Sequence, residues 1–73
     1  MDFLKIKGKD ILPIEVKNKE VTKSDDVHSM IYFLEKYNRE KGIIVTSGEE
    51  RSMMVGRKHI VFVPLWKFFL EQE

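Results

Sequence analysis

The stretch that decides the fold is DFLKIKGKDILPIEVK, residues 2–17. Apolar and polar residues alternate on either side of Gly8-Lys9, which is typical of two strands that each bury one face. Glycine at the first of two loop positions favours a tight hairpin turn. We therefore predict a β-hairpin with strands over residues 3–7 and 11–17. Pro13 cannot donate a ladder hydrogen bond, so we expect it at an edge or opposite a gap.

The predicted turn also fixes which residues of the hairpin face each other. Leu4 then pairs with Pro13, and Asp2 pairs with Glu15, while Lys17 shares their face. Two opposed carboxylates repel each other, and a divalent cation between them removes that repulsion. We predict an Mg²⁺ site at Asp2 and Glu15, with Lys17 positioning a water or stabilising charge on a phosphate. The alternative, that Lys17 only neutralises Glu15 at the sheet margin, stays open.

The rest of the chain alternates between helical and strand patterns. A polar loop is expected up to Lys23, followed by a helix over about residues 25–39 with Ser24 as its cap. Asp25 and Asp26 suit the positive end of the helix dipole. We expect Gly42 to end this helix or to begin the next strand.

Two short apolar runs, residues 43–45 and 60–63, predict strands buried on both faces. The segment between them, residues 47–58, is polar and predicts a loop, with a loose hairpin as an alternative. Pro64 is expected to begin a short apolar helix that continues over residues 65–71. The prediction is one α+β domain over residues 1–73, ordered ββαββα, in which a helical crossover joins parallel strands of a mixed sheet.

Composition excludes several classes of function. The 73 residues include no cysteine, which excludes disulfides and cysteine-based zinc sites, and no apolar run long enough to span a bilayer. No phosphate-loop pattern is present, so the chain is not itself an ATPase. His28 and His59 show no metal-type spacing, and we expect a solvated side chain for His28 and a strand end for His59. A cytoplasmic protein without a membrane partner is expected.

The hairpin segment DFLKIKGKDILPIEVKNK resembles that of the PD-(D/E)XK nuclease superfamily, which has the restriction-endonuclease-like fold. There, an Asp on one strand is followed by Glu-x-Lys on the next, and the matching residues here are Asp2, Glu15 and Lys17. A narrower resemblance is to the C-terminal domain of a group of largely archaeal ATPases of unknown function, which carries a similar VDF…PIEVK segment. GIIVTSG at 42–48 and IVFVPLWKFFL at 60–70 are also similar to that group.

The resemblance implies Mg²⁺-dependent hydrolysis of nucleic acid, with Asp2 and Glu15 as metal ligands and Lys17 orienting the water. The superfamily core begins with a helix and a strand before the Asp strand, whereas this sequence begins at Met1. We therefore expect a truncated nuclease-like domain with an open sheet edge, through which it forms a homo-oligomer. The alternative is a non-catalytic structural module that keeps the nuclease fold and associates with itself.

Two further surfaces are expected from side-chain chemistry. Basic residues form local clusters although the net charge is only +1, and they predict nucleic-acid contacts at Lys5, Lys7, Lys19, Arg51, Arg57 and Lys58. Together with Lys17, these residues also support a third interpretation, nucleic-acid binding without cleavage. Trp66, Phe68 and Phe69 are candidates for a partner-binding face, and the competing interpretation is that two of the three cover the core.

Overall fold

A computed structural model describes residues 3–8, 10–17 and 23–71, and the side chains of residues 8, 11–17 and 23–70 among them. The described residues form five strands and two helices, and the α+β class with a mixed sheet is confirmed. In chain order they are β1 (Phe3–Lys7), β2 (Asp10–Val16), α1 (Ser24–Lys36), β3 (Lys41–Thr46), β4 (Arg51–Val55), β5 (Lys58–Pro64) and α2 (Leu65–Glu71).

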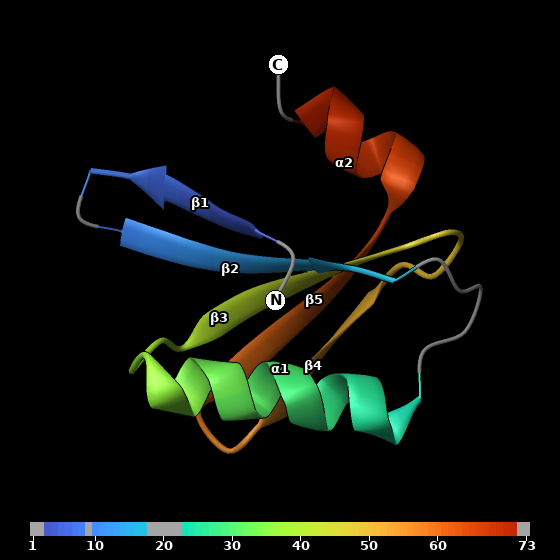
Figure 1. The fold of residues 1–73 in the computed structure, drawn as a ribbon. Coiled ribbons are helices and arrows are strands. Elements are labelled where there is room, and N and C mark those ends of the chain that lie inside the picture. The colour runs from blue at the N-terminus through green and yellow to red at the C-terminus, as the bar shows by residue number, and fades with distance from the viewer. Residues whose placement is uncertain (1–2, 9, 18–22, 72–73) are drawn as a thin grey trace.

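The strands lie in the order β1-β2-β3-β5-β4 (Figure 1). The central strands β2, β3 and β5 are parallel, whereas β1 and β4 pair antiparallel with β2 and β5. Helix α1 is the crossover between β2 and β3, which confirms the predicted parallel connection. Strands β1 and β4 are the two edges of the described sheet.

The predicted hairpin register is confirmed. Lys7 pairs with Asp10 and Leu4 pairs with Pro13, as a two-residue turn requires. Gly8 has a φ of 63°, a conformation that glycine adopts without a steric penalty. Pairing of β2 with β3 begins only at Ile14, so Pro13 lies ahead of that ladder, as expected.

The helices cover opposite faces of the sheet (Figure 1), because β3 and β5 place apolar residues on both sides. On the α1 face, Val27, Met30 and Leu34 pack against Ile44, Ile60 and Phe62. On the α2 face, Phe68 packs with Ile14, Val45 and Val63. The prediction that these strands are buried on both faces is thereby confirmed.

Strand β4 corrects the prediction of a loop over residues 47–58 and supports its alternative, a hairpin, because Val55 of β4 pairs with Lys58 of β5. The element order is therefore ββαβββα, with β4 as an edge strand antiparallel to β5. Its side chains are exposed apart from the partly buried Met53. Because Met53 is the only β4 side chain that is partly buried against the core, the sequence lacks the apolar periodicity by which strands are recognised.

The ends of α1 also differ from the prediction. Lys23, not Ser24, is the N-cap residue. The helix ends at Lys36 rather than near Arg39, and Asn38 with a φ of 54° terminates it. The N–H groups of Asn38 and Arg39 donate to the carbonyls of Glu35 (3.2 Å) and Leu34 (2.8 Å), which is the Schellman arrangement. Gly42 accordingly does not end the helix and lies within β3.

The C-terminal segment differs in two respects. Pro64 is the last residue of β5 and is buried, so α2 follows the strand directly. Of its three aromatic side chains only Phe68 is buried, whereas Trp66 and Phe69 are 62% and 63% exposed. The interpretation that two of the three cover the core is therefore wrong, because a helix this short turns a single aromatic position toward the sheet.

Gly42 is required by the close approach of α1 to β3. A Cβ atom at this position would lie 2.5 Å from Sδ and 3.1 Å from Cγ of Met30, whose side chain is fully buried. The buried Met30 side chain would have to shift within the core, so we expect Gly42→Ala to lower the free energy of unfolding by about 1–3 kcal/mol.

Urea denaturation followed by circular dichroism measures this change. Gly48→Ala is the matched control, since nothing lies within 4 Å of a Cβ atom there, and it should change stability by less than about 0.5 kcal/mol. Equal stability of the two variants would contradict the packing described for Gly42 and Met30.

Candidate functional site

Glu15 lies near the carboxyl end of β2, on the face of the sheet that α1 covers. Its neighbour Ile14 belongs to the core on the α2 face, and alternation along the strand therefore directs Glu15 to the other side. The residue is only 8% exposed and pairs with Ile44 of β3 in the parallel ladder. A carboxylate this deeply buried needs a charged or hydrogen-bonding partner.

Lys17 is the charged partner of Glu15, and it also pairs with a second acid, Asp26. Its Nζ atom lies 3.0 Å from Oε1 of Glu15 and 3.8 Å from Oδ1 of Asp26. The Lys17 side chain is 28% exposed, whereas those of Glu15 and Asp26 are 11% and 5% exposed. The three side chains form an acid–lysine–acid cluster, and its lysine is the member most open to solvent.

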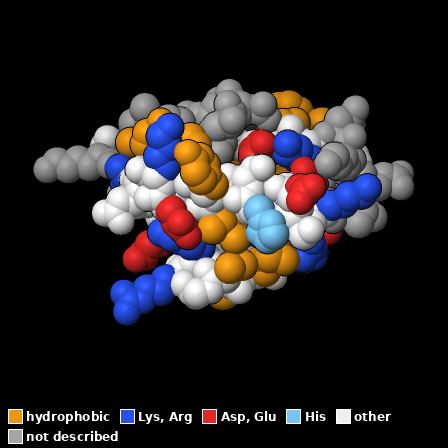
Figure 2. All heavy atoms as spheres, turned by 60° about the horizontal axis from the view of Figure 1, so that its bottom comes forward, with side chains coloured by type: hydrophobic (Ala, Val, Ile, Leu, Met, Phe, Trp, Pro, Cys, Tyr) orange, Lys and Arg blue, Asp and Glu red, His pale blue; other side chains and the backbone are white. Residues whose placement is uncertain are grey.

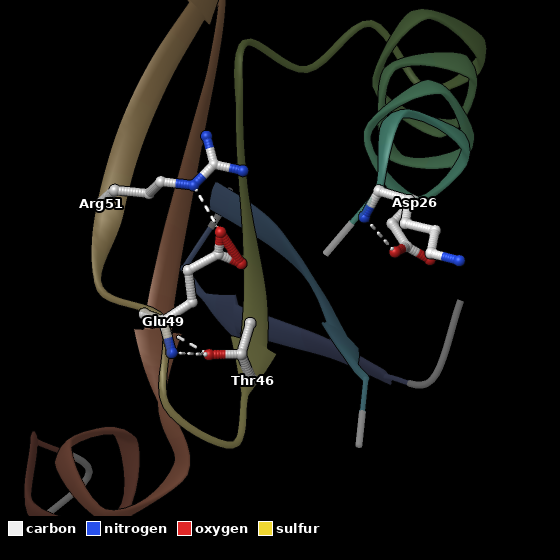
Figure 3. A network of polar contacts seen from close by, with 5 residues as sticks. Asp26, Thr46, Glu49 and Arg51 are labelled. Atoms are coloured by element: carbon white, nitrogen blue, oxygen red, sulfur yellow. Dashed lines mark hydrogen bonds and ion pairs between the residues drawn. The ribbon is translucent and has the colours of Figure 1, made fainter. Parts of the chain in front are cut away.

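Asp26 is held in this cluster by the start of α1. Its Oδ2 atom accepts a hydrogen bond from the backbone N–H of Lys23 at 2.8 Å, which fixes the first turn of the helix. Figure 3 shows Asp26 at this first turn, across from the connection between β3 and β4. The sequence marked Asp26 only as a helix-start acid. The signal that could have found its role is its place one turn into the helix that follows the Glu-x-Lys strand.

The connection after β3 carries a second polar network on the same side of the sheet. Thr46 Oγ1 donates to the carbonyl of Glu49 at 2.9 Å and accepts from its N–H at 2.8 Å. The Glu49 carboxylate pairs with Nε of Arg51 at 2.6 Å (Figure 3). The Arg51 guanidinium lies 4.1 Å from the ring centre of Phe62. The Thr46–Glu49 hydrogen bonds fix the turn between β3 and β4, and the Arg51 side chain covers Phe62 of the core.

A shallow, open hollow of about 520 Å³ lies beside Glu15. Its other lining residues come from consecutive turns of α1 and are His28, Ser29, Tyr32 and Phe33. The exposed side chain of His28 agrees with the expectation that it is solvated, and His59 lies in the first residues of β5 as expected for a strand end. The buried carboxylate of Glu15 is thus reachable from solvent on the α1 side.

The structure unites two of the three predicted catalytic residues. Glu15 and Lys17 form an ion pair, whereas Asp2 lies outside the described residues, so its place opposite Glu15 stays a prediction. Within the described part of the chain, no three His, Cys, Asp or Glu side chains gather as a metal site would require. The carboxylates of Glu15 and Asp26 both turn toward the Lys17 ammonium, and carboxylate oxygens are also the ligands that hard cations such as Mg²⁺ take.

The residues predicted to contact nucleic acid do not form one described patch. Arg51 begins β4, whereas Arg57 and Lys58 follow its far end, and Lys58 donates to the carbonyl of Arg39 at 2.7 Å. Lys19 lies outside the described residues, as do the side chains of Lys5 and Lys7. In the view of Figure 2, charges of both signs are interspersed with apolar side chains over the described surface.

The fold and the cluster define a class of protein: an α+β domain with helices on both faces of a mixed sheet and charged groups at the carboxyl end of a parallel strand. The model of a family described as a domain of unknown function, DUF4143, matches residues 1–68, and the chain belongs to this family. No curated protein and no solved structure matches the chain. Neither described helix has the length and apolar character that crossing a membrane requires.

The position of Asp26 predicts its contribution to stability. Asp26→Ala removes the acceptor for the Lys23 N–H and one of the two acids beside Lys17, so we expect a loss of about 1–3 kcal/mol in the free energy of unfolding. Asp25→Ala is the matched control, because Asp25 lies in the same helical turn but is exposed. It should cost only a few tenths of a kcal/mol, about the size of a dipole interaction.

Urea unfolding of both variants measures the difference. Equal losses would mean that Asp26 acts only through the helix dipole and not through the cluster.

Proposed function

We propose that the chain is a nuclease-like domain that hydrolyses phosphodiesters of nucleic acid with the help of Mg²⁺. The observation that carries this proposal is the Glu15–Lys17 pair, at 3.0 Å, near the carboxyl end of a parallel strand and beside an open hollow. In open α/β sheets, ligands bind outside the carboxyl ends of the strands. The resemblance of the hairpin to the PD-(D/E)XK pattern gives these residues their roles.

In this proposal Glu15 holds the metal ion together with Asp2, the predicted second ligand. Bound Mg²⁺ supplies Lewis acidity at the phosphate and at the attacking water. The Lys17 ammonium donates hydrogen bonds to that water or to a non-bridging phosphate oxygen, where negative charge develops. The water oxygen forms a bond to phosphorus and releases a proton to solvent, while the bond to the leaving oxygen breaks and that oxygen takes up a proton from solvent. Asp26 keeps Lys17 in position from the other side.

We also propose that this domain is part of a larger ATPase and acts in the cytoplasm. Domains of this family are typically found C-terminal to an ATPase, which supports a role as the accessory domain of such a protein, as the resemblance to the largely archaeal group implies. The absence of cysteine from the sequence is consistent with a cytoplasmic location.

Cleavage assays on the whole chain test the proposal. Labelled single- and double-stranded DNA and RNA are incubated with Mg²⁺ or Mn²⁺, and cleavage should stop when EDTA is added. Glu15→Gln removes a ligand charge and Lys17→Met removes the ammonium, so we expect each to lower the rate by about 10²-fold or more. Glu40→Gln is the control, because this exposed acid lies at the opposite end of β3 and should leave the rate unchanged.

A residue-by-residue Mg²⁺ titration by NMR provides the independent readout. If the unaltered chain shows no metal-dependent cleavage and no shift at Glu15, the nuclease proposal is overturned.

The second candidate function is a non-catalytic module that associates with itself. Two observations favour it: β1 is an edge strand of the described sheet, and several large apolar side chains of α2 are exposed. An unpaired edge offers backbone donors and acceptors to a second chain. Sedimentation velocity tests this candidate, and a chain that stays monomeric at high micromolar concentration would remove it.

A further inference from the structure

The outer surface of α2 carries an unusual amount of exposed apolar area. Leu65, Trp66, Phe69 and Leu70 are 41%, 62%, 63% and 61% exposed. At about 100° per residue, these four positions fall within an arc of about 140° on the helix. Phe68 points from the same helix into the core, so α2 is anchored and its outer face is fixed in orientation. Monomeric proteins rarely leave such a contiguous patch open to water.

A socket lies at the base of this patch. It is a hollow of about 150 Å³ whose lining includes Leu65, Val16 and Val45. Most of the exposed lining is apolar, and Lys17, Thr46 and Ser47 also contribute to it. An apolar space of about this volume accommodates a benzene ring, so the side chain of a phenylalanine or a leucine fits it.

We propose that the outer face of α2 and this hollow form a self-association surface, and that its occupant is a second copy of this chain. The surface carries both protruding aromatic side chains, Trp66 and Phe69, and a hollow large enough to hold a phenylalanine side chain. A patch that contains both parts is complementary to itself across a two-fold axis. This inference rests on the second candidate function above, and it assigns the contact to α2 rather than to the β1 edge.

The charge nearest the patch does not oppose the association of two copies. Lys67, the one charged side chain described on α2, forms an ion pair with Glu50. This pairing lowers the repulsion that a bare lysine would meet at a two-fold contact. Among the described side chains, the four that form the outer face of α2 carry no charge, and an apolar face of this kind suits an identical one.

The area available matches a weak dimer. From the exposed fractions, the four side chains offer roughly 400–500 Å² per copy, so a two-fold contact removes roughly 800–1,000 Å² from water. That area lies at the lower end of specific interfaces, so we expect a dissociation constant of about micromolar magnitude. The aromatic pair at its centre is of the type that dominates binding energy.

The single tryptophan of the chain provides a direct readout. Sedimentation velocity and the emission of Trp66 are measured on the whole chain from low to high micromolar concentration. We expect a monomer–dimer equilibrium, with the Trp66 emission moving to shorter wavelength as dimer forms. Phe69→Glu keeps the reporter and should weaken association by about thirtyfold or more and abolish that shift.

The matched control is Tyr32→Glu, which places the same charge at an exposed aromatic position of α1 and should leave both readouts unchanged. If circular dichroism shows that Phe69→Glu does not fold, Leu70→Glu on the same exposed arc replaces it.

The remaining outcomes overturn the inference in distinguishable ways. A strict monomer would remove both self-association and this surface. If Phe69→Glu leaves the dimer intact, self-association would stand but the contact would lie elsewhere, for example at the β1 edge. A blue shift that appears only with phospholipid vesicles, and not with protein concentration, would assign the surface to a membrane instead.

Discussion

The burial of β3 and β5 on both faces is the constraint on which the rest of the structure depends. Ile44 and Val45 are consecutive in β3, point to opposite sides of the sheet, and are both fully buried. Such a strand is stable only when apolar cover lies on each side, and α1 and α2 provide it. The crossover through α1 then makes β2 parallel to β3, and antiparallel strands complete the sheet at both ends.

This constraint also explains the charged cluster. Because Ile14 must join the core on the α2 face, its neighbour Glu15 has to lie on the α1 face with little contact to water. A buried carboxylate is costly unless a positive charge accompanies it, and Lys17, two residues further along, reaches it from the same side. Asp26 adds a second negative charge, so the three side chains together carry a net charge of −1.

Much of the fold could be predicted from the sequence because it depends on local rules. The Gly8 turn predicted the hairpin register that the structure shows, and the alternation along β2 predicted that Glu15 and Lys17 share one side. Two features escaped prediction for physical reasons. Strand β4 is largely exposed, with only Met53 partly buried against the core, so its residues carry no periodic apolar pattern. Asp26 joins Lys17 through the packing of α1 on the sheet, a tertiary contact that spacing along the chain does not reveal.

The two faces of the sheet carry different kinds of chemistry, and they share the same strands. The α1 face holds the ion pairs of Glu15 and Lys17, whereas the α2 face ends in exposed apolar side chains. A partner bound to α2 binds only the folded chain and therefore stabilises the whole sheet by mass action. Strand β3 pairs with β2 at Glu15 and packs under α2 through Val45. The proposed association on the α2 face would therefore support Glu15 through β3, and it would also lie beside Lys17, which lines the hollow.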